Sequence, residues 1–324
     1  MRKILVNFFE LETKNTSVKR ELLAGATTFI TMVYIIFVNP SMMAETGMDY
    51  GASFVGTCLA AAFACFAMGI FANWPIALAP GMGLNAFFTY TVVGEMGYSW
   101  QVALSAVFIA GVLFLIISVT PLRRWILESI PSSLRIAMGA GIGLFIGFIG
   151  LKSSGIIISN PVNYLSLGDL TKAEPYLGLL GFLIITVLSI RKVPGAIMLG
   201  ILAITVISIL SKKVEFSGVV SVPPSIVPVL FELDFNGALD VGMVSVVLTF
   251  LFVNLFDTAG TLLAVVSSAN LVNPQGKIEN LDRALKADST SSIVGTFVGC
   301  APVTSYVESS AGISAGGRSG LTAV

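Results

Sequence analysis

The sequence predicts an all-α, polytopic membrane protein. Hydrophobic residues make up 55% of the 324-residue chain and charged residues only 11%, whereas soluble domains carry about 25% charged residues. Two acidic residues, Asp257 and Glu308, lie inside otherwise apolar stretches. A carboxylate at membrane depth is costly and usually marks a functional site. Both acids also lie near Gly, Ser, Thr or Pro residues, as in the broken helices around which secondary transporters build a substrate site.

About ten stretches can be assigned as spans, because a helix needs about 20 residues to cross the hydrocarbon core. The block from Tyr50 to Gly94 has no charge and is too long for one helix, and Asn73-Trp74-Pro75 divides it. The expected spans are 22–44, 51–72, 76–94, 100–120, 134–151, 175–190, 194–211, 240–268, 287–301 and 303–322.

The basic residues predict a cytoplasmic N-terminal segment over 1–21, because loops on the cytoplasmic side carry an excess of Lys and Arg. Alternation then places the loop 212–239 outside the cell and the loop 273–288, which contains Lys277, Arg283 and Lys286, inside. The other basic residues that fall on the cytoplasmic side are Arg2, Lys3, Lys14, Lys19, Arg20, Arg123, Arg124, Arg135, Arg191 and Lys192.

Seven expected spans precede the outer loop, and an odd number inverts the orientation of whatever follows. A second set of seven would therefore form an inverted-topology repeat of the first. Short internal sequence similarities agree with this: Val38-Asn39-Pro40 resembles Val253-Asn254-Leu255, and Ala79-Pro80 resembles Ala301-Pro302.

The third span is expected to be interrupted. Pro75, Pro80, Gly81 and Gly83 oppose a continuous helix, so the first half should be extended and a helix should begin near Gly81. Unpaired N–H groups at that start would face the membrane interior as donors, with Asn85 on the first helical turn. The alternative is a Pro-kinked packing helix in which Asn85 bonds to a neighbour.

The tenth span repeats this arrangement over 301–320, where Pro302 precedes small polar residues and Glu308 lies near the start of the helical part. If the two half-helices face each other, their ends and Glu308 enclose one polar cavity. Arg318 is expected to extend to the cytoplasmic end instead of touching a ligand.

The eighth span contains Asn254 and Asp257, which are three residues apart and therefore share a helical face. Thr258 and Thr261 can bond to backbone carbonyls. Asp257 could be a proton site, a substrate anchor or both, and the alternative is a structural pair with a polar neighbour.

Several other functions are disfavoured. Histidine is absent, which removes Ser-His-Asp and Cys-His catalysis and the His-containing metal motifs, and the three cysteines have no CxxC spacing. No basic block suggests nucleic acid. Asp257 lies in LFDTAGT instead of the GxGD motif of a membrane aspartyl protease. An acid-lined channel and an anion exchanger remain as rivals, although an exchanger should place a cation opposite the half-helices.

Four stretches resemble the nucleobase–cation symporter 2 family, and within it the AzgA-like purine permeases for adenine, guanine and hypoxanthine. They are TTFITMVYIIFVNPSMM (27–43), APGMGLNAFF (79–88), NLFDTAGTL (254–262) and TSYVESSAGISAGGRSGLTAV (304–324). The resemblance implies two inverted repeats of seven helices in a plasma membrane homodimer. It also implies a core domain (22–120 and 240–324) that moves against a gate domain (134–211), with 212–239 as an extracellular loop.

The resemblance implies proton-coupled purine uptake without a cofactor, the proton being the coupling ion. Asp257 or Glu308 would carry the proton. Alternatives are a related-fold transporter for an anion, uracil or xanthine, or a fragment that does not transport, because the family continues through about four more helices after the tenth span. The substrate-binding residues implied are Asn85, Gly83, Asp257, Glu308, Asn254 and Ser309.

Overall fold

The computed structural model describes residues 2–120, 132–161, 163–193, 195–214, 218, 221–268 and 278–324. The chain divides into two compact units, unit 1 (Met1–Ile136 and Pro223–Val324) and unit 2 (Ala137–Val222). Unit 1 contains the expected core segments and unit 2 most of the expected gate segment, but their roles as core and gate stay predictions. Arg123, Arg124 and Lys277, used above for orientation, lie outside the described residues.

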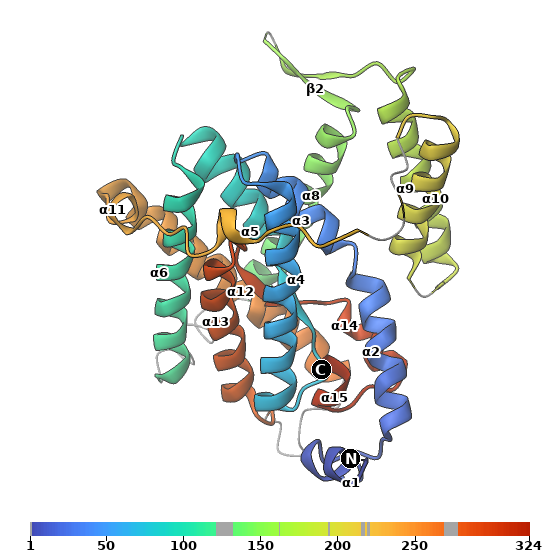
Figure 1. Ribbon diagram of the computed structural model, residues 1–324, viewed down its shortest axis with the longest axis vertical. Helices are drawn as coiled ribbons and strands as arrows, with labels where there is room; N and C mark the ends of the chain where they lie inside the picture. The colour runs from blue at the N-terminus through green and yellow to red at the C-terminus, as the bar shows by residue number, and fades with distance from the viewer. Residues whose placement is uncertain are drawn as a thin grey trace. The chain divides into compact units, whose positions relative to one another are not determined.

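Unit 1 is helical apart from two short strands (Figure 1). Its elements are α1 (Arg2–Phe8), α2 (Val18–Met32), α3 (Ile35–Ala44), α4 (Tyr50–Ala67), the π-helical η1 (Met68–Ala72), β1 (Leu78–Pro80), α5 (Met82–Ala86), the π-helical η2 (Phe87–Glu95), α6 (Trp100–Val119), the 3₁₀ turn η3 (Val227–Val229), α11 (Phe235–Ala238), α12 (Val241–Ser268), α13 (Leu281–Phe297), β4 (Val303–Ser305), α14 (Ser309–Ser314) and α15 (Gly320–Ala323).

The first expected span is one apolar stretch with a break. α2 ends at Met32 and α3 begins at Ile35, and Val33 and Tyr34 form the turn between them. Pro40 lies inside α3, where it has no N–H to donate to the carbonyl four residues earlier. The break places Tyr34 at the middle of the span, where its side chain can reach another element.

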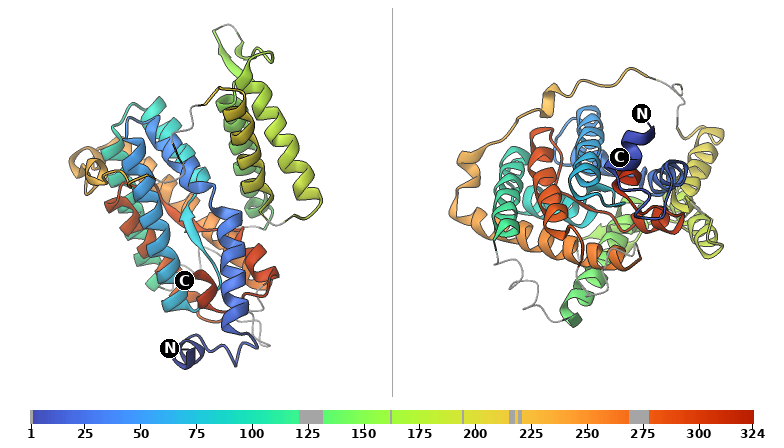
Figure 2. Two further views of the ribbon diagram at one scale, coloured as in Figure 1. Left: turned by 45° about the vertical axis from the view of Figure 1, so that its right-hand side comes forward. Right: turned by 90° about the horizontal axis from the view of Figure 1, so that it is seen from below.

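Helices α6, α13 and α4 lie side by side in unit 1 (Figures 1 and 2). Small residues let the backbones approach: a Cβ at Gly56 would collide with the carbonyl oxygen of Val298, and one at Gly111 would lie 3.0 Å from Ile293. Small residues at helix contacts are typical of packing in a membrane.

Helix α13 differs from the expected ninth span, 287–301, because it begins at Leu281 and ends at Phe297. The charged residues of its first turns are helical and were assigned to a loop. Its end is a Schellman motif: Cys300 N–H donates to the Gly295 carbonyl (2.9 Å) and Gly299 N–H to that of Thr296 (3.2 Å). Gly299 adopts a φ of 68°, which glycine tolerates without strain.

Unit 2 consists of α8 (Ser132–Ser153, whose first residues belong to unit 1), the hairpin of β2 (Ile157–Asn160) and β3 (Tyr164–Leu167), α9 (Ala173–Ile190) and α10 (Ala196–Leu210). α9 and α10 pack against each other (Figure 2). A Cβ at Gly181 would lie 3.0 Å from Ile204, and one at Gly200 would collide with Ile185. Two glycines therefore set the distance between these helices.

Among the described residues, four helical segments are long and apolar enough to cross a membrane: Val18–Ala44, Tyr50–Ala72, Trp100–Val119 and Ala173–Ile190. Shorter apolar helical stretches are Gly143–Ser153, Ala196–Leu210 and Gly242–Thr258. The count of ten spans and the arrangement in two sets of seven stay predictions.

A buried carboxylate joins the start of α2 to the segment after α14. Glu21 is 0% exposed. Its Oε2 accepts hydrogen bonds from the Ser319 hydroxyl (2.7 Å) and the Thr322 hydroxyl (2.7 Å), and its Oε1 accepts from the Arg318 N–H (2.9 Å). Arg318 donates from its guanidinium to the Ile313 carbonyl (2.8 Å), at the end of α14. Glu21 thus fixes the far end of the half-helix that begins after Glu308.

We expect Glu21→Ala to lower the free energy of unfolding by about 3 kcal/mol or more, because each buried donor left without its acceptor costs about 1–3 kcal/mol. The measurement is the thermal unfolding midpoint of the purified protein in detergent. Glu12→Ala is the matched control, since Glu12 is exposed. Equal midpoints for the two variants would contradict the anchoring role of Glu21.

Candidate functional site

The two interrupted segments meet. β1 and β4 pair antiparallel, with Leu78 opposite Ser305 and Pro80 opposite Val303. The pairing continues at both ends, where Gly81 N–H donates to the Pro302 carbonyl (2.9 Å) and Tyr306 N–H to the Ala77 carbonyl (3.0 Å). Figure 2 shows β1 as an arrow between the helices of unit 1. The interruption predicted for the third and tenth spans is therefore confirmed.

The pairing explains how extended backbone is tolerated here. Backbone polar groups in hydrocarbon must find partners inside the protein, and each of these strands supplies the other. The strands approach closely, because a Cβ at Gly81 would lie 2.6 Å from the Thr304 methyl group. Gly81 is therefore needed for the contact.

The N–H groups at the two half-helix starts are partly used within the protein. The Gly81 N–H, expected to be unpaired, donates to Pro302. In α14, the N–H groups of Ser309, Ser310 and Ala311 donate to carbonyls three residues earlier, at 3.0–3.2 Å. The expectation of a free donor is wrong at Gly81, because strand pairing takes up its N–H, and tight turns take up the N–H groups at the start of α14.

The two acids singled out from the sequence lie beside the pair of β1 and β4, which we call the crossing. Asp257, half-buried on α12, hydrogen-bonds the Thr304 side chain of β4, and Glu308 is one of its electrostatic neighbours. Glu308 immediately precedes α14 and is also half-buried. The Tyr34 hydroxyl donates to Glu308 Oε1 (2.7 Å), so the break between α2 and α3 supplies a donor to this acid.

Asn254 and Ser309 border the crossing but bond to the protein itself. Asn254 Nδ2 donates to the Ser292 hydroxyl (3.4 Å), while its Oδ1 is buried and has no hydrogen-bond partner among the described residues. Ser309 is fully buried, and its Oγ accepts from the Ala77 N–H (3.0 Å). Ser309 therefore fastens α14 to the extended segment before β1.

Asn85 lies in a separate polar chain. It is fully buried, and its Nδ2 donates to Asn39 Oδ1 (2.5 Å), whose own Nδ2 donates to the Thr57 hydroxyl (2.7 Å). This bond to a neighbour is the alternative raised from the sequence. The Asn85 Oδ1 has no partner among the described residues. Gly83, in the same short helix, is half-buried.

The sequence analysis missed a third acid at this crossing, Asp288 of α13. It is 0% exposed, its Oδ2 accepts from the Thr258 hydroxyl (2.8 Å) and its Oδ1 from the Ser305 hydroxyl (3.2 Å). It thereby links α13, α12 and β4, and Asp257 is an electrostatic neighbour. It falls where the expected inner loop 273–288 and the expected span 287–301 overlap, and it was not singled out.

Tyr34 and Tyr306 were also missed. Tyr306 is 6% exposed, and its hydroxyl donates to the Pro80 carbonyl at 2.5 Å. Each tyrosine joins two segments that are more than 200 residues apart in the sequence. No sequence signal separates them from Tyr90 and Tyr176, which also lie inside expected apolar spans.

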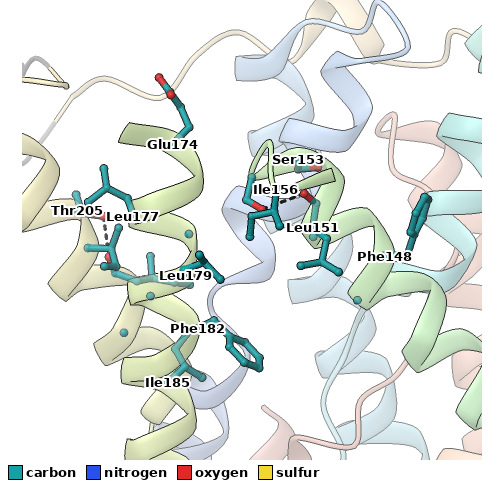
Figure 3. Close-up of a pocket in the computed structure, with 18 of the residues that line it drawn as sticks. Phe148, Leu151, Ser153, Ile156, Glu174, Leu177, Leu179, Phe182, Ile185 and Thr205 are labelled. Atoms are coloured by element: carbon teal, nitrogen blue, oxygen red, sulfur yellow. Dashed lines mark hydrogen bonds between the residues drawn. The ribbon is translucent and has the colours of Figure 1, made fainter. Parts of the chain in front are cut away.

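A groove of about 1030 Å³ in unit 2 has a different chemistry (Figure 3). It lies between α8 and the α9–α10 pair, and apolar side chains such as Leu151, Leu179 and Phe182 line it, with Glu174 at one end. Small-molecule sites combine apolar walls with a few polar groups that fix the ligand. The crossing in unit 1 has such groups, and this groove has few.

The named neighbours of Asp257 and Glu308 at the crossing are acids, hydroxyls and amides. Carboxylates accept hydrogen bonds and, when protonated, donate one. The arrangement therefore suits a ligand that presents N–H donors. In the part of the chain that the structure describes, no three His, Cys, Asp or Glu side chains are grouped to hold a metal ion.

Comparison with known proteins identifies the family. The model of the xanthine/uracil permease family, described as "Permease family", matches residues 19–324. The chain belongs to this family, which is nucleobase–cation symporter 2. As a member of the permease family it is a transporter and not an enzyme, and it is a multi-pass protein of the cell membrane.

Two curated relatives are purine permeases. The adenine permease AdeP of Escherichia coli (strain K12) is 46% identical over 321 residues, which cover 99% of this chain and 72% of that protein. The guanine/hypoxanthine permease PbuO of Bacillus subtilis (strain 168) is 43% identical over 322 residues, covering 98% of this chain and 74% of that protein.

Solved structures place this permease in a known transporter fold. The transmembrane domain of a cyanobacterium bicarbonate transporter, BicA, superimposes with a TM-score of 0.65 at 13% identity, covering 94% of this chain and 79% of that one. At this identity the likeness concerns the fold alone. It agrees with the class of helical membrane transporter expected from the sequence.

Proposed function

We propose that the protein is a secondary active transporter that takes up purine nucleobases, namely hypoxanthine, guanine and adenine, together with protons. The observation that carries the proposal is the meeting of Asp257 and Glu308 at the β1–β4 crossing. The purine permeases among the relatives support the substrate class.

The chemistry of the base matches the crossing. A hypoxanthine or guanine ring presents N–H donors along its edge, and the carboxylates of Asp257 and Glu308 accept such donors. Hydrogen bonds to charged groups contribute about 1.5–3 kcal/mol each. The buried Oδ1 atom of Asn254 has no partner among the described residues and is a further acceptor on the helix that carries Asp257.

Proton coupling follows from the cost of burying charge. An ionised carboxylate in a low-dielectric environment is costly, and protonation removes most of that cost. Asp257 or Glu308 would take up the proton, and the two acids are electrostatic neighbours. The transporter would then change conformation with both the base and the proton bound. Movement of the core domain against the gate domain, in a homodimer with its N-terminus cytoplasmic, completes the proposal.

The chemistry of the crossing disfavours anion transport, although the bicarbonate transporter shares the fold. An anion site needs a cation or free N–H donors. The crossing supplies acids where such a site needs a cation, and the N–H groups at the start of α14 are already engaged. The fold likeness therefore does not extend to the ligand.

The test is uptake of radiolabelled hypoxanthine, guanine and adenine by cells that lack their own purine permeases. We expect concentrative uptake at acidic external pH that a protonophore abolishes, and competition by unlabelled purines but not by uracil. Cells with the empty vector are the control. Uptake that a protonophore leaves unchanged would contradict proton coupling, and bicarbonate uptake without purine uptake would contradict the substrate class.

A further inference from the structure

A second candidate site lies at one end of unit 1, between α13 and the α4–η1 helix. It is a groove of about 460 Å³ with two cations, Arg283 and Lys286. The other residues that line it are Phe63, Ala67, Ile70, Phe71, Ala287 and Thr290. None of these residues belongs to the crossing of β1 and β4.

The cations lie at one end of the groove, and its apolar wall begins there and continues away from them. Arg283 and Lys286 are both exposed on the first turns of α13, one helical turn apart. Ile70 and Phe71 lie just before Ala72, whose carbonyl bonds to Asn280 at the start of α13. Phe63 lies about 10 Å from Ile70 along the α4–η1 helix, at 1.5 Å per residue.

Hydrogen bonds fix that end of the groove to the N-terminal segment. Trp74 Nε1 donates to the Glu279 carbonyl (2.9 Å), and Asn280 Nδ2 donates to the Ala72 carbonyl (3.2 Å). Lys14 Nζ donates to the Asn73 carbonyl (2.9 Å). Since the basic N-terminal segment is proposed to be cytoplasmic, the charged end of the groove faces the cytoplasmic membrane surface.

The apolar wall indicates the kind of ligand. Phe63 is 39% exposed, Ile70 45% and Phe71 65%, so these side chains are open to whatever fills the groove. A free phosphate would gain nothing from them, whereas an acyl chain would cover them. Basic pockets between membrane helices on the cytoplasmic side suit anionic lipid headgroups.

We propose that this groove binds an anionic phospholipid, with the phosphate between Arg283 and Lys286 and an acyl chain along Phe63 and Ile70. Glu279 and Asp282 lie at the same end of α13, so the net charge there is small. Selection for the lipid therefore comes from the two cations within the groove and not from a broad positive field. The proposal uses the cytoplasmic orientation but does not depend on the transported substrate.

The test is lipid binding by the intact purified protein, measured by native mass spectrometry during titration with phosphatidylglycerol or with phosphatidylcholine of the same acyl chains. We expect preferential retention of phosphatidylglycerol. The double variant Arg283→Gln/Lys286→Gln should weaken that binding about 30-fold, from the usual contribution of two basic residues near anionic lipid. Phe63→Ala/Phe71→Ala should also weaken it, since exposed side chains contribute to the wall.

The matched control is Arg191→Gln/Lys192→Gln, which removes two exposed cations at the end of α9, also expected to be cytoplasmic. It should bind phosphatidylglycerol like the unmodified protein. Equal retention of the two lipids would overturn the proposal. A loss of phosphatidylglycerol binding in the control as large as that in Arg283→Gln/Lys286→Gln would overturn it too. The last measurement is the thermal unfolding midpoint of the protein with inorganic phosphate or with phosphatidylglycerol. If phosphate raises the midpoint as much as the lipid does, the site takes a free anion and the lipid assignment is wrong.

Discussion

Replacing Glu308 with alanine is expected to reduce hypoxanthine uptake, measured as kcat/KM, by about 10- to 100-fold for each hydrogen bond lost from the base to the carboxylate. The carboxylate lies beside Asp257 at the crossing and receives the Tyr34 hydroxyl. Alanine removes the acceptor for the base and leaves that hydroxyl without its partner. Initial rates of radiolabelled hypoxanthine uptake, corrected for the amount of protein in the membrane, give the measurement.

Three further variants separate the roles of the two acids. Asp257→Ala should reduce uptake to a similar degree, and Tyr34→Phe should raise KM more modestly because the ring and its packing are kept. Glu95→Ala is the control, since Glu95 is an exposed acid at the end of η2. Uptake that survives in both Glu308→Ala and Asp257→Ala would rule out the roles assigned to these acids.

Asp288→Ala is expected to abolish most uptake and to destabilise the protein. The side chain is fully buried and accepts the hydroxyls of Thr258 and Ser305. Its removal leaves both hydroxyls without this acceptor, at about 1–3 kcal/mol for each one that stays unpaired. Because Thr258 also contacts Thr304, at 3.2 Å between hydroxyl oxygens, a shift of β4 would displace the partner of Asp257.

Asp288→Asn separates hydrogen bonding from charge. The amide keeps an acceptor and can donate to a hydroxyl oxygen, so the links to α12 and β4 should largely persist, and uptake should exceed that of Asp288→Ala. Asp282→Asn on the same helix is the control, because Asp282 is exposed. Thermal unfolding in detergent and uptake are both measured, and normal values in Asp288→Ala would show that the acid has no positioning role.

The sequence was sufficient to locate the interruptions and two of the acids. Pro80, Gly81 and Pro302 are strong local signals, because proline lacks an N–H and glycine removes the side chain that would block close approach. Asp257 and Glu308 stand out because charge is rare in apolar stretches. These signals are local, and the structure has breaks at the corresponding positions.

Long-range pairing could not be predicted in the same way. The register of β1 with β4 joins residues more than 200 positions apart, and no local pattern specifies it. Asp288 lies at the edge of the expected span 287–301, beside the charges of Asp282, Arg283 and Lys286, whereas in the structure it lies two turns inside α13. Asn85 was expected at the substrate, and its bond to Asn39 depends on the packing of α3 beside α5.

A structure of the protein with hypoxanthine bound tests most directly whether the two broken segments form the purine site. The account predicts density for the base beside the β1–β4 pair, with ring nitrogens within about 3 Å of a carboxylate oxygen of Asp257 or Glu308. Hypoxanthine bound in the apolar groove of unit 2, or anywhere away from both carboxylates, would contradict it.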